Sequence, residues 1–441
     1  MLKRTLFVLL VSLCLSQTAR ADDFPMQSFS LDNGLQVVVI ENHKAPIVKH
    51  MVFYKAGASF EKPGKGGVAH LLEHLMFRGT QKVKGQTFNR ILEENGADSN
   101  AFTAQDMTAY HQFLDLSRLE LALFLEADRM QGLQISDADF EAEREIVFQE
   151  RKQRVDNNPS ALFIEKVKKV LWQDHPYGQP VTGQDEEIRA LTKEDVLTFY
   201  RQYYAPNNAV VVLSGDIDVS TAKKLVQKYY GALKPTQFNQ PSFKSLPKGY
   251  RVKVEMNLPE VRAERYLKVF AVPSIVQNPD MAYALDVLSE YLTGDENAPL
   301  HQKLVLERQQ ALNVSASYDG VARSYGTFIL SVVPKSKINE FFEKQLEKAV
   351  DEALYSMTED KIEKVKKKML AELVYLKDNP STLATLAGYT LATGGSLDDL
   401  QRYAQRIEKV DLKAVWNAAE EMRRFAPQVT GILRPEEKGH E

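Results

Sequence analysis

Cysteine is almost absent from this sequence, since Cys14 is the single one in 441 residues. It lies in MLKRTLFVLLVSLCLSQTARA, where Lys3 and Arg4 precede an apolar run and a small-x-small ending, a pattern typical of a cleavable secretory signal peptide. The run is too short to span a bilayer, so no stable membrane anchor is expected. We expect cleavage after Ala21 and a mature protein in the periplasm or outside the cell. Without Cys14, disulfides and thiolate ligands are excluded, and a metal would need His, Asp or Glu.

An excess of positive charge is also lacking. The formal net charge is −3, and it falls to −6 when Lys3, Arg4 and Arg20 leave with the signal peptide. A mildly acidic protein is a poor partner for nucleic acid, so no nucleic-acid binding is expected. With 44% hydrophobic and 26% charged residues, the composition is that of a globular protein. Its length predicts two or more domains.

Histidine is scarce, yet two of the 8 histidines occur in HLLEH, residues 70–74. In a helix, His70 and His74 are one turn apart on one face, and Glu73 projects toward the same side. Two imidazoles at this spacing can share a divalent ion, and the carboxylate beside them can act as a base. The alternative is an amphipathic helix with solvated or hydrogen-bonded histidines. The motif therefore predicts a metal site as a hypothesis.

A third ligand is expected from a carboxylate on another helix, because a catalytic zinc site usually has three protein ligands and an open position. The segment FEAEREIVFQE offers Glu141, Glu143, Glu145 and Glu150. Glu143 and Glu150 are two turns apart and share a face, where a buried carboxylate is costly unless it is paired or bound to metal. Glu141 and Glu145 also fit a solvated face. Spacing alone does not decide the role of Glu150.

The remaining pattern predicts an α+β fold of two similar domains, each a mostly antiparallel sheet with helices packed on one face. A hairpin is expected around Asn33-Gly34. Residues 233–250, rich in Pro, Ser, Gln and Lys, read as a linker between an N-terminal domain at 22–232 and a C-terminal domain at 251–441. Strand-like runs followed by a helix in both parts suggest an internal repeat. The second part has only His301 and His440, which assigns the metal chemistry to the first.

HLLEH is the inverted zinc motif, and the chain resembles the pitrilysin/insulinase (M16) family of zinc metallopeptidases. It is most similar to the short bacterial subfamily that also resembles the mitochondrial processing peptidase β subunit. In that family a helix about 75 residues after the motif carries the third ligand. The resemblance implies one Zn2+ per chain, held by His70, His74 and Glu150. It also implies Glu73 as general base, Glu143 as a supporting residue, and hydrolysis of peptide bonds.

The resemblance also implies how a peptide substrate is held. The segment SNAFTAQDMTAYH matches the strand after the zinc helix, so Asn100, Ala101 and Phe102 would lie on an exposed edge to which an extended peptide adds as another strand. In the second half Arg323, with Tyr325 or Tyr318, is a candidate for contacting substrate opposite the metal.

Family resemblance further implies a dimer that encloses the substrate. We expect a heterodimer with a related M16 subunit that lacks the zinc motif, in preference to a homodimer. Two other classes of function stay open: a non-catalytic peptide-binding or assembly subunit, and a periplasmic scaffold with a structural zinc. A structural site would have four protein ligands.

Overall fold

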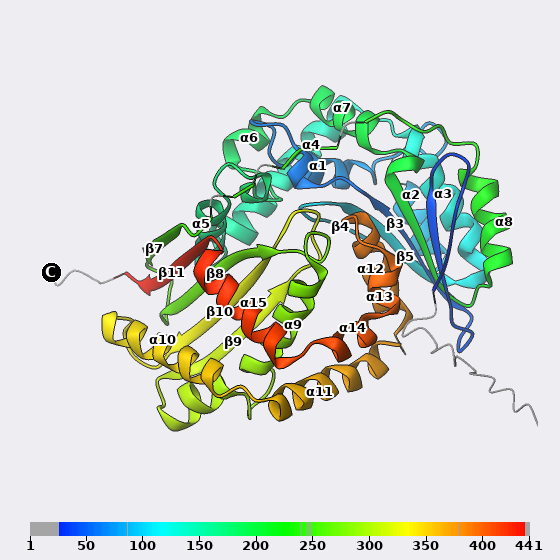
Figure 1. Cartoon of the computed structure of the whole chain (residues 1–441). Coiled ribbons are helices and arrows are strands. Elements are labelled where there is room, and N and C mark those ends of the chain that lie inside the picture. The colour runs from blue at the N-terminus through cyan, green and yellow to red at the C-terminus, as the bar shows by residue number, and fades with distance from the viewer. Residues whose placement is uncertain are drawn as a thin grey trace, which may run out of the picture.

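The computed structural model describes residues 26–436, apart from residues 86, 239, 244, 247 and 378. The predicted signal peptide and its cleavage site lie outside the described residues. Two β-sheets form the framework, one in the part of the chain before residues 233–250 and one in the part after them (Figure 1). Below, "first half" means residues 26–232 and "second half" means residues 251–436. The described residues of 233–250 contain no helix or strand.

The first sheet has the strand order β1-β2-β6-β3-β5-β4. Strands β2 and β6 run parallel, and the other neighbouring pairs are antiparallel. Its strands are β1 (Gln27–Ser30), β2 (Gln36–Glu41), β3 (Ile47–Tyr54), β4 (Asp98–Thr103), β5 (Thr108–Asp115) and β6 (Ala209–Gly215). The helices of this half are α1 (Val68–Leu75), α2 (Thr87–Glu94), α3 (Leu119–Gly132), α4 (Asp137–Arg151), α5 (Pro159–Trp172), α6 (Asp185–Ala190), α7 (Lys193–Tyr203) and α8 (Val219–Tyr230).

The second sheet has the order β7-β11-β8-β10-β9, with β7 and β11 parallel and the rest antiparallel. Its strands are β7 (Arg251–Leu258), β8 (Arg265–Pro273), β9 (Ala311–Asp319), β10 (Tyr325–Pro334) and β11 (Gln428–Pro435). The helices are α9 (Pro279–Thr293), α10 (Glu340–Tyr355), α11 (Glu359–Lys377), α12 (Pro380–Ala392), α13 (Leu397–Gln401), α14 (Tyr403–Lys409) and α15 (Leu412–Phe425).

The two sheets share one topology. Taken in chain order, β2, β3, β4, β5 and β6 of the first sheet correspond to β7, β8, β9, β10 and β11 of the second, with the same neighbours and the same parallel pair. In both halves the second strand of this series is followed by a helix: α1 comes after β3 in the first half, and α9 comes after β8 in the second. This correspondence supports the internal repeat that the sequence suggested, and it makes β4 and β9 equivalent edge strands.

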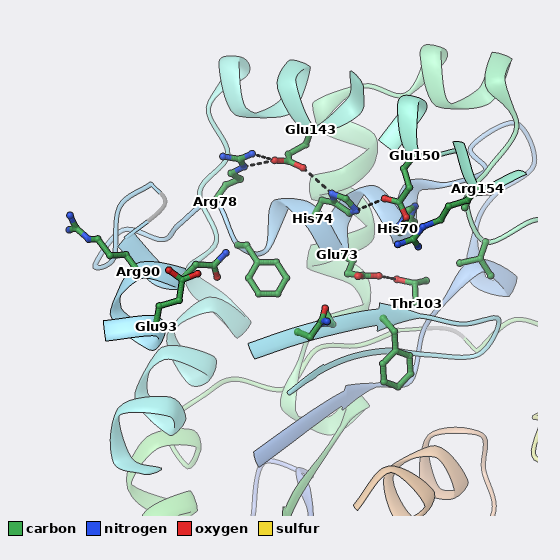
Figure 2. Close-up of a pocket in the computed structure, with 17 residues that line it drawn as sticks. His70, Glu73, His74, Arg78, Arg90, Glu93, Thr103, Glu143, Glu150 and Arg154 are labelled. Atoms are coloured by element: carbon green, nitrogen blue, oxygen red, sulfur yellow. Dashed lines mark hydrogen bonds and ion pairs between the residues drawn. The ribbon is translucent and has the colours of Figure 1, made fainter. Parts of the chain in front are cut away.

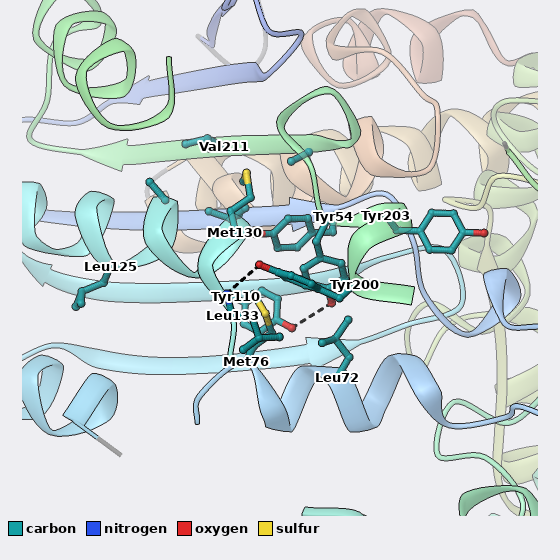
Figure 3. Packing of buried hydrophobic residues seen from close by; sticks show 14 of the residues in the cluster. Tyr54, Leu72, Met76, Tyr110, Leu125, Met130, Leu133, Tyr200, Tyr203 and Val211 are labelled. Carbon is teal, nitrogen blue, oxygen red and sulfur yellow. Dashed lines mark hydrogen bonds between the residues drawn. The ribbon is translucent and has the colours of Figure 1, made fainter. Parts of the chain in front are cut away.

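One face of each sheet is covered by helices of the same half. In the first half this core includes the buried side of α1, where Leu72 and Met76 pack near Tyr110 of β5 (Figure 3). The tyrosine rings stack among themselves: Tyr54 and Tyr204 lie 3.9 Å apart between ring centroids. Packing of this kind fixes the position of α1 on the sheet, because displacing the helix would open a void in the core.

The opposite face of each sheet is covered by a helix from the other half. Helix α12 packs on β2, β3 and β6, while α5 packs on β7, β8 and β11 (Figure 1). A glycine permits each close approach: a Cβ on Gly388 of α12 would lie 2.0 Å from the Phe53 ring, and one on Gly431 of β11 would lie 2.7 Å from Phe163 of α5. Each half therefore completes the packing of the other.

The structure confirms the expected α+β class, with two mostly antiparallel sheets and helices. It also places a hairpin turn at Asn33-Gly34, where Gly34 has a φ of +86°, and it makes residues 68–75 helical. The expectation that helices cover one face of each sheet was incomplete. It holds for helices of the same half, but a sheet buried on one face only would leave Phe53 and its neighbours in solvent, and the exchanged helices prevent this.

Candidate active site

A glycine turn and a carboxylate fix the start of helix α1. Gly67 has a φ of +86°, and a Cβ there would lie 2.9 Å from the carbonyl oxygen of Thr182, so only glycine fits. The Glu61 carboxylate accepts hydrogen bonds from the backbone N–H groups of Gly67 at 3.0 Å and Ala69 at 2.9 Å. These are donors that a helix N-terminus leaves without intrahelical partners. The loop before α1 therefore sets the position from which HLLEH projects.

Two imidazoles and one carboxylate meet above α1. His70 and His74 come from α1, Glu150 comes from the last turn of α4, and one donor atom of each lies within 4.8 Å of the others. Nε2 of His70 is 3.6 Å from Oε1 of Glu150, and Nε2 of His74 is 3.4 Å from Oε2. In a tetrahedral site with metal–ligand bonds of ~2.1 Å, neighbouring donors lie about 3.4 Å apart. The donor set and its spacing therefore fit Zn2+.

A carboxylate and a guanidinium support the second histidine. Glu143 of α4, which is 4% exposed, lies with Oε2 3.0 Å from Nδ1 of His74. Arg78 donates two hydrogen bonds to Oε1 of the same carboxylate, through Nε and Nη2 (Figure 2). When Nδ1–H donates to Glu143, Nε2 carries the lone pair that faces Glu150, and this tautomer is the one that a metal requires.

The two histidines differ in their electrostatic environment. Burial and the neighbouring His74 lower the pKa of His70 to about 4, so His70 is neutral near pH 7. Burial also lowers the pKa of His74, but hydrogen bonds with Glu143 and Glu150 outweigh it and raise that pKa to about 9. In the metal-free protein near pH 7, the site therefore carries one proton, on His74, that a metal must displace.

Glu73 lies on the same side of α1 as the two histidines. Burial raises the pKa of its carboxyl group, which makes the carboxylate a stronger base. Its Oε2 accepts a hydrogen bond of 2.5 Å from the hydroxyl of Thr103 on β4 (Figure 2). A carboxylate so placed, beside a metal-binding group, can take a proton from water.

These side chains line a cavity of about 860 Å³. One wall is α1 and α4, and another is the edge strand β4, whose residues Asn100, Ala101, Phe102 and Thr103 line it. Side chains alternate along the strand: Thr103 reaches Glu73, whereas Phe102 points to the opposite face of the sheet, where its ring lies 6.2 Å from that of Phe53. The cavity is therefore bordered by an open backbone edge as well as by the metal-binding group.

Among the cavity residues that were not singled out from the sequence, Arg78, Thr103 and Arg154 each bond a carboxylate of the site. Arg154, on a π-helical turn after α4, forms an ion pair of 2.6 Å with Glu150. Arg78 follows His74 by four residues and Arg154 follows Glu150 by four, so helical spacing was a usable signal for both. No comparable signal exists for Thr103, because its contact joins a helix to a strand.

Arg323 and Tyr325 lie outside this cavity. The Arg323 guanidinium donates to the carbonyl of Ala392 and to Gln240, both at 2.8 Å. The Tyr325 hydroxyl accepts a hydrogen bond from the backbone N–H of Leu246. Within one chain these contacts tie together segments of the fold, as does the bond from Tyr318 to the carbonyl of Pro273. A role for Arg323 or Tyr325 in contacting substrate opposite a partner's site stays a prediction.

Comparison with known families decides the classification. The family model described as "Insulinase (Peptidase family M16)" matches residues 36–185, and the one described as "Peptidase M16 inactive domain" matches residues 190–369. The chain belongs to the M16 peptidase family. The metal-binding group thus lies in the part matched by the first M16 model. Helix α9, the counterpart of α1 in the second half, contains no histidine.

The similarity to individual M16 relatives extends over nearly the whole chain. The chain is 29% identical to "Zinc protease PqqE" of Helicobacter pylori, over 93% of this chain and 94% of the relative. It is 24% identical to "Probable mitochondrial-processing peptidase subunit beta" of Schizosaccharomyces pombe, over 90% and 88% of the two chains. The crystal structure of a protease from Helicobacter pylori matches with a TM-score of 0.86 and 26% identity, covering 93% of this chain and 100% of the other. Relatives named zinc protease support a zinc-dependent protease.

Proposed function

We propose that this M16 chain is a zinc-dependent endopeptidase that hydrolyses extended peptides or unfolded segments. The observation that carries the proposal is the placement of Glu73 between the His70, His74 and Glu150 group and the open edge of β4. A metal-binding group, a basic carboxylate and a backbone edge meet in one cavity of about 860 Å³. Peptide hydrolysis uses all three.

The donor set fits Zn2+, which when bound would supply a Lewis acid that activates water and polarises the substrate carbonyl. His70, His74 and Glu150 would hold the ion. Glu73 accepts a proton from the attacking water and returns it to the leaving amine, the work of a general base and then a general acid. Glu143, itself held by Arg78, keeps the His74 ring in its orientation.

The substrate lies as an added strand along β4 in this proposal. Strand β4 is the last strand of its sheet, so one side of its backbone is open to a peptide that supplies N–H and C=O groups. A folded protein has already used these groups in its own structure. The enzyme should therefore cleave an unstructured peptide far faster than the same sequence inside a stable domain.

The proposal is tested by assaying the purified chain with unstructured peptides, with and without a chelator, and after zinc is restored. Glu73→Gln should retain one zinc per chain and lose at least ~10²-fold in kcat. Glu145→Gln is the matched control, because Glu145 lies on the exposed side of α4, where it accepts a hydrogen bond from the Gln149 side chain. Retained turnover in a metal-loaded Glu73→Gln protein would refute the role of Glu73.

The same experiment separates the other two classes of function. A non-catalytic peptide-binding subunit would bind peptide without cleaving it, with or without zinc. A structural-zinc scaffold would show a fourth protein ligand in a metal-loaded structure. Among the described residues, the structure gathers three candidate ligands at the site, His70, His74 and Glu150, which favours the catalytic alternative.

We further propose that the working enzyme is a dimer, with a related M16 subunit lacking the zinc motif as the preferred partner. The support is the position of Arg323 and Tyr325: neither lines the cavity of its own chain, so substrate contacts opposite the metal would come from another chain. Size-exclusion chromatography followed by a peptidase assay tests this. High activity from a pure homodimer, lost on Arg323→Ala, would contradict the heterodimer.

The proposed location is the periplasm or the outside of the cell, on the basis of the predicted signal peptide. Across the described part of the chain, no helix is both long and apolar enough to cross a membrane. N-terminal sequencing of the mature protein would show whether it begins at Asp22.

A further inference from the structure

One hydrogen bond joins the proposed base to the strand that borders the cavity. The Thr103 hydroxyl lies 2.5 Å from Oε2 of Glu73, although the two residues are thirty positions apart in the sequence. Glu73 belongs to α1 and Thr103 is the last residue of β4. Figure 2 shows the two side chains meeting between the helix and the strand.

The strand fixes where this hydroxyl points. Side chains alternate along β4, so Thr103 and Ala101 face α1 while Phe102 faces the other side of the sheet. Threonine is branched at Cβ and has few rotamers in a strand, so its hydroxyl has little freedom. The donor that reaches Glu73 is therefore held by the sheet and not by a mobile loop.

The backbone of Thr103 faces the open edge of the strand. Thr103 pairs with Thr108, and at the next pair the N–H of Ala104 donates to the carbonyl of Met107 at 2.8 Å. Hydrogen-bonded and non-hydrogen-bonded pairs alternate along an antiparallel ladder. The N–H and C=O of Thr103 therefore point away from β5, toward the side on which a substrate strand would add.

We propose that Thr103 is a positioning residue that sets the orientation of the Glu73 carboxylate and couples it to substrate docking. Its hydroxyl donates a hydrogen bond to Oε2 of Glu73, which leaves Oε1 of that carboxylate to accept a proton from the attacking water. Its backbone offers hydrogen-bonding groups to the peptide that brings the scissile bond. This inference rests on the proposed peptidase function and deepens it.

Three variants test the inference in the zinc-loaded protein. Thr103→Val keeps the branched shape and the strand preference but removes the donor, and it should lower kcat by about 10–100-fold with KM and zinc content nearly unchanged. Thr103→Ser restores a hydroxyl and should restore most of kcat. Thr108→Val is the matched control, because the Thr108 hydroxyl bonds the carbonyl of Ala56 and does not touch Glu73; it should keep the wild-type kcat.

Two outcomes would overturn the inference in an active enzyme: a wild-type kcat in Thr103→Val, or equal losses in Thr103→Val and Thr103→Ser, which would indicate a purely structural role. If the wild-type protein cleaves no peptide, the proposed function fails and crystal structures of the zinc-loaded wild type and Thr103→Val decide about Thr103. A Glu73 carboxylate that turns away in the variant supports the positioning role. A carboxylate that stays in place refutes it.

Discussion

Zinc binding by this protein should depend steeply on pH, because the metal competes with a proton on His74. Hydrogen bonds that the protonated His74 ring donates to Glu143 and Glu150 raise the pKa of His74 to about 9 in the metal-free protein and outweigh the effect of burial. The pKa of His70 is about 4, so that ligand is already neutral above pH 6. The site must therefore release one proton, from His74, when zinc binds near pH 7.

The magnitude follows from this pKa. At pH 7 only about one molecule in 100 has a neutral His74, which weakens zinc binding by ~100-fold, or ~2.7 kcal/mol, relative to a neutral site. At pH 6 the penalty is roughly 1000-fold and at pH 8 roughly tenfold. The apparent affinity should therefore rise about tenfold for each pH unit between pH 6 and pH 8.

Competition with a chelator of known zinc affinity at each pH measures this slope. Calorimetry in buffers of different ionisation enthalpy counts the protons released, with close to one expected per zinc at pH 7. Glu143→Gln should flatten the slope, because an amide stabilises the imidazolium less than a carboxylate does. An affinity that is constant between pH 6 and pH 8, with no proton released, would refute the assignment of the proton to His74.

Two other predictions concern single side chains. Glu150→Gln should leave the protein depleted of zinc by atomic absorption while circular dichroism stays near that of the wild type; a variant that still holds one zinc tightly would place the third ligand elsewhere. Asp106→Ala should lower the free energy of unfolding by about 3–5 kcal/mol, because its carboxylate accepts hydrogen bonds from Ser59, Tyr177 and the backbone of Arg323 and so joins the two halves. Chemical denaturation measures this free energy of unfolding. A decrease below ~1 kcal/mol would show that the contact between the two halves does not depend on the Asp106 carboxylate.

Much of the site was predictable because its residues lie at helical spacings. His70, Glu73 and His74 share one face of α1, and Glu143 and Glu150 share one face of α4, so periodicity alone grouped each set. Periodicity did not predict that α1 and α4 lie side by side. This pairing came from the M16 resemblance, and the structure shows its physical basis: α4 packs directly against α1, and both helices contribute to one hydrophobic core.

Other features of the site had no local signal. The contact of Thr103 with Glu73 depends on the register of β4 and β5 and on the position of α1 above them. The partial burial of Arg323 depends on how the second half meets the first, where its backbone bonds Asp106 and its side chain bonds Ala392. Sequence patterns describe one element at a time, so contacts between elements escape them.

The sequence by itself determined the α+β class and the residue types able to hold a metal without cysteine, and it suggested a repeat of two halves. These depend on composition and on periods of two and 3.6 residues, which are local properties of a chain. Only the tertiary structure decided that α5 and α12 cover the sheets of the opposite halves, where Gly431 and Gly388 allow close contact. It also decided that β4 is an open edge beside Glu73. Both arise from packing between segments far apart in the chain, where burial of apolar surface outweighs local preference.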